Sequence, residues 1–263
     1  HAKRVEALGY DMLSVPEAVH DGMLTSYAAL AATSLQAQGS AASRDLSRFT
    51  DPALHVARAA RLTGAAPHID GALDEAAWDA APPIRDFVQK VPIEGNAPTV
   101  ATEVRILYDD TAIYVGVMNF DSDPGRIVSS DARRDSALSG QDNFQLIFDT
   151  YHDKQNGFIF GTNAAGIQYD AQVRNEGETL RGGPPTGLAG GNSGGAGAGI
   201  NTNWDGSWVV KTSQTDHGWS AEFAIPLKTL RYGPPPQTWG VNFSRNIEHK
   251  REVVYWSPVS RIY

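Results

Sequence analysis

From about Ala57 onward, the chain is made of short apolar runs that alternate with polar residues and are separated by turns. In the run 102–108, Val104 and Ile106 fall on one side, and charged residues stand between and beside them. A period of two residues is typical of a β-strand that buries one face. Because such runs recur over the rest of the chain, the sequence predicts an all-β, antiparallel sandwich of the jelly-roll or immunoglobulin-like type.

The predicted strands are joined by short polar connections, such as 151–157 and 216–218, which favour tight turns and hence hairpins. Pro226 suits the start of a short helix that ends at Leu230. The stretch 181–200 has almost no side chains that can pack, so we expect a flexible glycine-rich insert there. Further strands are predicted at 113–120, 144–148, 158–162, 167–173, 208–211, 219–225, 239–247 and 252–256.

Residues 1–55 differ from this pattern and are predicted to form a short helical and linker extension, without being an independent domain. The sandwich domain then occupies 56–263. Residues 2–34 resemble the first unit of a luciferase-like monooxygenase, through 7–11 (Ala-Leu-Gly-Tyr-Asp) and the run that follows Val15. Nothing downstream continues such a barrel, so we interpret the likeness as a remnant. A signal-like segment over 23–38 is the alternative interpretation.

Composition excludes several classes of protein. The 263 residues contain no cysteine, which excludes zinc fingers, disulfide frameworks and thiol catalysis. A net charge of −8 argues against a nucleic-acid partner, because such a surface needs a basic patch. The longest uncharged stretch is broken by polar residues, and no transmembrane helix is predicted. The chain begins with His1 instead of Met, and we expect it to be a fragment of a longer protein.

The segment 69–78 (Ile-Asp-Gly-Ala-Leu-Asp-Glu-Ala-Ala-Trp) predicts an edge strand, a tight turn and one helical turn that buries Trp78. Three later motifs follow it in order: 142–144 (Asp-Asn-Phe), 218–223 (Gly-Trp-Ser-Ala-Glu-Phe) and 239–243 (Trp-Gly-Val-Asn-Phe). In this combination the chain resembles the carbohydrate-binding module family 9-like domains over roughly residues 60–260. The subgroup it resembles precedes a bacterial outer-membrane β-barrel.

This resemblance implies a β-sandwich that binds a polysaccharide or glycan without catalysis, as part of a cell-envelope protein in the periplasm or at the outer membrane. A role in carbohydrate catabolism follows from the same family, as does contact with a C-terminal outer-membrane barrel of the same protein. Two alternatives stay open: a structural domain that docks on that barrel, and an accessory domain of a glycoside hydrolase, which would link the protein to O-glycosyl hydrolase activity.

Aromatic residues are the first candidates for a sugar site, because sugar rings stack on aromatic faces. Most of the tryptophans lie at inward positions of predicted elements, where a buried ring is expected. Trp204 follows the glycine-rich insert and stands between polar neighbours, and Tyr151 lies at a strand end. We therefore predict Trp204, Tyr151 and Asn163 as carbohydrate contacts. The tryptophans predicted to be structural are Trp78, Trp208, Trp219 and Trp239.

The sequence predicts no catalytic residue, metal centre or cofactor. Glycoside hydrolysis needs two facing carboxylates, and no second carboxylate is tied to Glu222 by any motif. The histidines show no metal-ligand spacing. Calcium is the one cation that the acidic residues would suit, as a stabiliser, but they lack the compact spacing of a calcium loop. The weak calcium candidates at strand ends are Asp142, Asp149 and Asp170.

Overall fold

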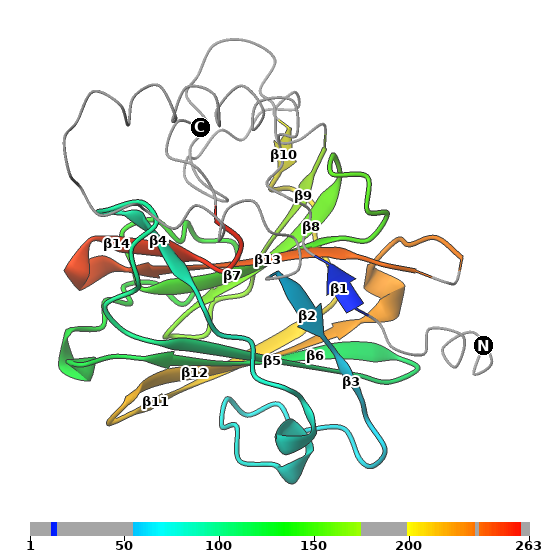
Figure 1. Cartoon of the computed structure of the whole chain (residues 1–263), viewed down its shortest axis with the longest axis horizontal. Coiled ribbons are helices and arrows are strands. Elements are labelled where there is room, and N and C mark those ends of the chain that lie inside the picture. Colours follow the sequence, from blue (N-terminus) through cyan, green and yellow to red (C-terminus); the bar gives the residue numbers. More distant parts are fainter. Residues whose placement is uncertain (1–11, 15–54, 175–198, 235–236, 259–263) are drawn as a thin grey trace, which may run out of the picture.

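The computed structural model describes residues 12–14, 55–174, 199–234 and 237–258, which form two stacked β-sheets (Figure 1). The all-β sandwich predicted from the alternating runs is therefore confirmed. Within the described residues the only helices are single 3₁₀ turns, and none is long and apolar enough to cross a membrane. The predicted helical extension lies almost wholly outside these residues, as does most of the glycine-rich insert.

The larger sheet has seven strands, all antiparallel to their neighbours. In spatial order they are β10 (Ile200–Asn201), β9 (Tyr169–Val173), β8 (Gly157–Asn163), β7 (Asn143–Asp149), β13 (Gly240–Ile247), β14 (Glu252–Tyr255) and β4 (Val88–Val91).

The smaller sheet has five strands, of which only the edge strand β3 pairs in parallel. A separate pair, β1 with β2, precedes it in the chain. In spatial order the five strands are β11 (Val209–Thr215), β12 (Gly218–Pro226), β6 (Ala112–Phe120), β5 (Thr102–Tyr108) and β3 (Ala60–Arg61), and the separate pair is β1 (Met12–Ser14) and β2 (Val56–Arg58). The 3₁₀ turns are η2 (Ala76–Ala80), η3 (Pro124–Arg126), η5 (Leu227–Thr229) and η6 (Glu248–Lys250).

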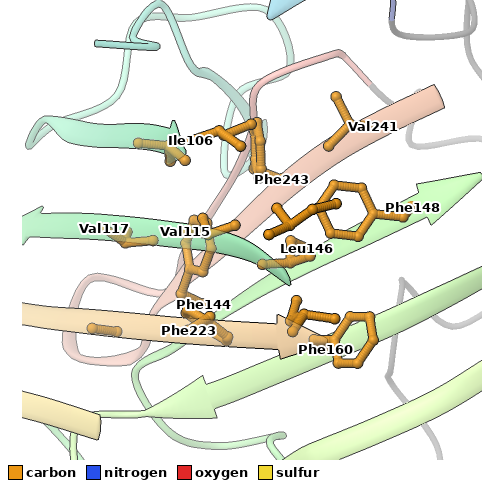
Figure 2. Packing of buried hydrophobic residues seen from close by; sticks show 14 of the residues in the cluster. Ile106, Val115, Val117, Phe144, Leu146, Phe148, Phe160, Phe223, Val241 and Phe243 are labelled. Atoms are coloured by element: carbon orange, nitrogen blue, oxygen red, sulfur yellow. The ribbon is translucent and has the colours of Figure 1, made fainter. Parts of the chain in front are cut away.

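The core fills the space between the sheets, as the period of two requires. Alternate residues of β7 (Phe144, Leu146 and Phe148) are fully buried and point toward the other sheet (Figure 2). The ring of Phe144 stacks on that of Phe243, with centroids 6.0 Å apart. Aromatic rings from both sheets thus meet in the core, as Phe144 also does with Phe223 of the smaller sheet. From the smaller sheet, the facing side chains include Ile106, Val115, Val117 and Phe223.

Trp78 is buried as predicted, but it lies outside this core. Its ring covers the outer face of the smaller sheet over Gly116, where a Cβ atom would come within 3.0 Å of it. The absence of a side chain at Gly116 leaves the room that the indole fills. The prediction of an edge strand at the start of the 69–78 segment is wrong, because Ile69 lies in a connection without strand pairing.

A single buried carboxylate holds this connection in place. Glu222 on β12 accepts hydrogen bonds from the backbone N–H of Asp70 (2.9 Å) and Gly71 (2.8 Å), and from Nε1 of Trp78 (3.0 Å). Gly71 has φ +98°, and a Cβ there would lie 2.4 Å from the backbone of Thr212. The turn therefore requires glycine, and the Glu222 carboxylate is occupied by backbone and indole donors.

Candidate functional site

An open cleft lies at the end of the sandwich where β7 turns into β8. Because Gly240 of β13 pairs with Asp149 of β7, the residues that follow Asp149 meet those that precede Gly240. The cleft has a volume of about 560 Å³. Its lining residues are Tyr151, Leu227, Lys228, Leu230, Arg231, Tyr232, Gly233 and Pro234.

One wall is the turn that carries Tyr151, whose side chain is among the most exposed apolar groups at 55%. The carboxylate of Asp149 accepts hydrogen bonds from the backbone N–H of Asp153 (3.2 Å) and Lys154 (2.7 Å). The hydroxyl of Thr150 donates to the carbonyl of Arg231 on the opposite wall. These bonds fix the turn, so the tyrosine ring is held in the solvent by a rigid support.

The other wall presents Tyr232, which is 42% exposed. Its ring packs against Trp239 with centroids 5.7 Å apart, and Trp239 packs in turn against Phe148 of the core at 5.9 Å. Nε1 of Trp239 donates to Oε1 of Gln237 (2.7 Å), which fixes the indole. Tyr232 therefore stands on a column of rings that begins in the core.

The chemistry of the cleft combines two aromatic faces with cationic groups. Tyr151 and Tyr232 offer ring faces and phenol hydroxyls, and exposed Lys228 and Arg231 line the same cleft. A pocket with aromatic lining and a few polar groups fits a ligand that has both hydrogen-bonding groups and an apolar face. Sugar rings have this character, with C–H groups on their faces and hydroxyls at their edges.

Comparison with known families bears on this site. Residues 69–254 match the family described as "carbohydrate family 9 binding domain-like", which covers most of the described sandwich. The chain belongs to this family. No curated protein matches the sequence, so membership rests on the family match.

Solved structures similar to this family 9-like domain share little sequence with it. A candidate carbohydrate-binding protein from Bacteroides uniformis has a TM-score of 0.54 at 13% identity, over 76% of this chain and 88% of that one. A family 9 module from Caldicellulosiruptor kristjanssonii in complex with glucose has a TM-score of 0.46 at 16% identity, over 74% and 84%. The same type of module with cellotriose has a TM-score of 0.45 at 17% identity, over 74% and 81%. At 13% identity, the likeness to the Bacteroides uniformis protein concerns the fold alone.

The family 9-like domain places Tyr151 in the cleft, but not Trp204. Trp204 is half-buried, with its ring 5.0 Å from that of Phe158 and 5.9 Å from that of Phe160. The ring lies at the same end of the sandwich as the cleft. Gly206 is in close contact with both Trp204 and Thr229, so the ring lies near the segment that carries Thr229. As a sugar platform Trp204 stays a prediction of the sequence alone, and its half-buried ring makes it a weaker candidate than the exposed Tyr151.

Asn163 lies at the far end of β8 and is fully buried. Its Nδ2 donates to the carbonyl of Asp131 (2.7 Å) and to Oε1 of Gln141 (2.8 Å). Its Oδ1 accepts from the backbone N–H of Ala165 (2.9 Å) and Ile167 (3.3 Å). Because the amide is buried and bonded on both sides, Asn163 holds a turn, and we do not propose it as a sugar contact.

The three weak calcium candidates lie at three separate places. Asp149 supports the cleft turn. Asp170 is buried and accepts from Arg134 (2.8 Å) and from Nε1 of Trp208 (2.7 Å), and burial raises the pKa of this carboxyl despite these donors. Asp142 lies at the opposite end of β7, where burial also raises its pKa. The three carboxylates therefore do not face one common point.

Sequence reasoning missed Tyr232 and the two cations beside it. They stand in the connection from η5 toward β13, which carries no motif of its own and no strand periodicity. Their position follows from the pairing of β13 with β7, which brings this connection against the Tyr151 turn. Strand neighbours of that kind are separated by some 90 residues here and cannot be found from local pattern.

Proposed function

We propose that this domain binds carbohydrate without catalysis, in the cleft between Tyr151 and Tyr232. The single observation that carries the proposal is the presence of two exposed aromatic rings in one cleft, together with cationic side chains. Family membership supports the ligand class. A polysaccharide or one of its chain ends fits an open cleft, because such a ligand extends beyond the pocket that holds one sugar unit.

The distribution of exposed apolar groups favours binding over the docking role. A docking module would show a contiguous apolar patch of several hundred Å². Among the residues that the structure describes, the two tyrosines share the cleft, and the other large exposed apolar side chains do not line it. Those others are Ile93, Phe120 and Val209.

We further propose that the domain acts in the cell envelope, as its family resemblance suggests. Fractionation of cells that express the full-length gene, with detection of this domain by antibody, tests the location. Recovery with periplasmic or outer-membrane material is expected, and recovery with the cytosolic fraction would contradict it.

Tyr151→Ala and Tyr232→Ala should each weaken binding of cellotriose and xylotriose at least about tenfold, because each removes a stacking face; tenfold corresponds to about 1.4 kcal/mol. Isothermal titration calorimetry measures the change. Both rings are exposed, so the melting temperature should stay within about 2 °C of the parent. Tyr151→Phe keeps the ring and should bind within about threefold of the parent.

Two further variants locate the site. Val209→Ala removes an exposed apolar side chain from the edge strand β11 and should leave affinity unchanged. Trp204→Ala should lower the melting temperature, since the ring packs on Phe158 and Phe160, but affinity should change by less than about threefold. If Trp204→Ala abolished binding while Tyr151→Ala did not, the site would belong to the Trp204 loop and the cleft assignment would be lost.

A further inference from the structure

A buried polar cluster lies between the sheets at the end of the sandwich opposite the cleft. Asp142 stands two residues before Phe144, and Arg245 two residues after Phe243, so both continue the inward faces of their strands. Both are fully buried. Asp121, which follows β6, is buried beside Arg245, and His249 reaches the cluster from η6. Charged groups thus replace apolar ones in the last layer of the core.

Several polar atoms in this cluster receive no hydrogen bond from the described protein. They include Oδ2 of Asp121, Oδ1 of Asp142 and both ring nitrogens of His249. The side chains of these aspartates are fully buried, and that of His249 is only 6% exposed. Nε2 of His249 lies 3.5 Å from Oδ1 of Asp121, without hydrogen-bond geometry. Buried polar groups of native proteins have partners, so these atoms call for one.

Three of these side chains converge on one point. One ligand atom from each of Asp121, Asp142 and His249 lies within 4.8 Å of the other two. Cation–ligand bonds of about 2.0–2.2 Å place two ligands of one zinc ion at most about 4.4 Å apart. A small inward movement of the side chains would therefore bring all three into contact with a single cation.

The charge of the cluster also favours a cation. Two carboxylates face one guanidinium, whose Nη2 lies 3.8 Å from Oδ2 of Asp121. Arg245 is committed elsewhere, since it donates to the carbonyls of Ala101 (2.9 Å) and Phe120 (2.8 Å). If both carboxyls are ionised, the Arg245 guanidinium balances one of them and one negative charge is left over.

We propose that Asp121, Asp142 and His249 bind one divalent cation of the zinc class, which ties the end of β6 to the start of β7 and to η6. The imidazole nitrogen decides the class, because calcium takes six to eight oxygen ligands, whereas zinc accepts histidine nitrogen together with carboxylate oxygen. Three protein ligands leave a fourth position for water. The site is distant from the cleft and does not depend on sugar binding.

The first test uses the whole chain, freed of metal with a chelator and dialysed. Addition of Zn²⁺ to about a hundred times its dissociation constant should raise the melting temperature by about 5–10 °C. Elemental analysis after desalting should find one zinc per chain, and Co²⁺ should give visible absorption bands of a low-symmetry site. A Ca²⁺ response equal to that of Zn²⁺, or no retained metal and no shift, would overturn the proposal and leave buried water as the partner.

Two matched substitutions assign the ligands. His249→Gln and Asp142→Asn keep side-chain size and should abolish the retained zinc and the thermal shift. His68→Gln makes the same change at a histidine whose side chain is 85% exposed and should retain both. Loss of the metal in His68→Gln with retention in His249→Gln would place it at the surface. If the internal variants fail to fold, the imidazole ¹⁵N resonances of the wild-type protein test the site. Zinc should then shift the resonances of a buried histidine. A shift of exposed histidines alone would contradict the site.

Discussion

Replacement of Glu222 by alanine should lower the free energy of unfolding by about 3–5 kcal/mol, although the residue lines neither the cleft nor the space between the sheets. The carboxylate is the shared acceptor of two backbone N–H groups and the Trp78 indole. Without it, three donors in a largely buried place lose their partner, and each such loss costs about 1–3 kcal/mol. Chemical denaturation followed by tryptophan fluorescence measures the change.

Two additional measurements test the mechanism of this loss. Glu222→Gln keeps the shape and one acceptor oxygen, so it should destabilise less than the alanine variant. Limited proteolysis of Glu222→Ala should cut the connection around 66–75 before the rest of the domain, because the anchor of that segment is gone. An alanine variant as stable and as protease-resistant as the parent would show that the segment is held by its apolar contacts alone.

Trp208→Ala should cost a similar amount, about 3–5 kcal/mol, through a different cause. The indole stacks on Phe223 with centroids 5.8 Å apart and meets Phe160 edge-on at 5.2 Å, so its removal leaves a cavity between the sheets. The same change removes the Nε1 donor from buried Asp170. Equilibrium unfolding in urea, with the slope checked for a single transition, gives the free energy.

Trp208→Phe separates the two contributions. The phenyl ring fills most of the space, so the variant should lose only the hydrogen bond and a little volume, about 1–2 kcal/mol. The exposed Val209→Ala, one residue along the chain, should stay within about 0.5 kcal/mol of the parent. Equal losses in the alanine and phenylalanine variants would mean that the bond to Asp170, and not the cavity, sets the cost.

The strands themselves were predictable because each is a local pattern. The alternation around Val104 and Ile106, and the phenylalanines of β7, correspond to inward positions in the structure. Burial of Trp208 and Trp219 followed from the same periodicity. One strand prediction was wrong: Ile69 pairs with no strand, and the Glu222 carboxylate instead binds the backbone N–H groups of the next two residues, Asp70 and Gly71.

The candidate site was predictable only in part. Tyr151 stood out because it ends a clear strand, and the structure places it in the cleft. Tyr232 lies in an irregular connection, and its exposure depends on the ring of Trp239 beneath it. Asn163 shows the opposite case, a polar residue at a strand end whose amide is consumed inside the protein.

The period of two residues along the chain determined the sandwich, since an alternating strand can bury its apolar face only against a second layer. The order of strands and what collects at each end were decided by tertiary structure. Pairing of β13 with β7 joins two distant connections into a cleft, and at the other end it brings Asp142 near His249. Asp121 joins them from the smaller sheet because the two layers stack. Such contacts depend on which strands are neighbours in space, and local periodicity contains no information about that.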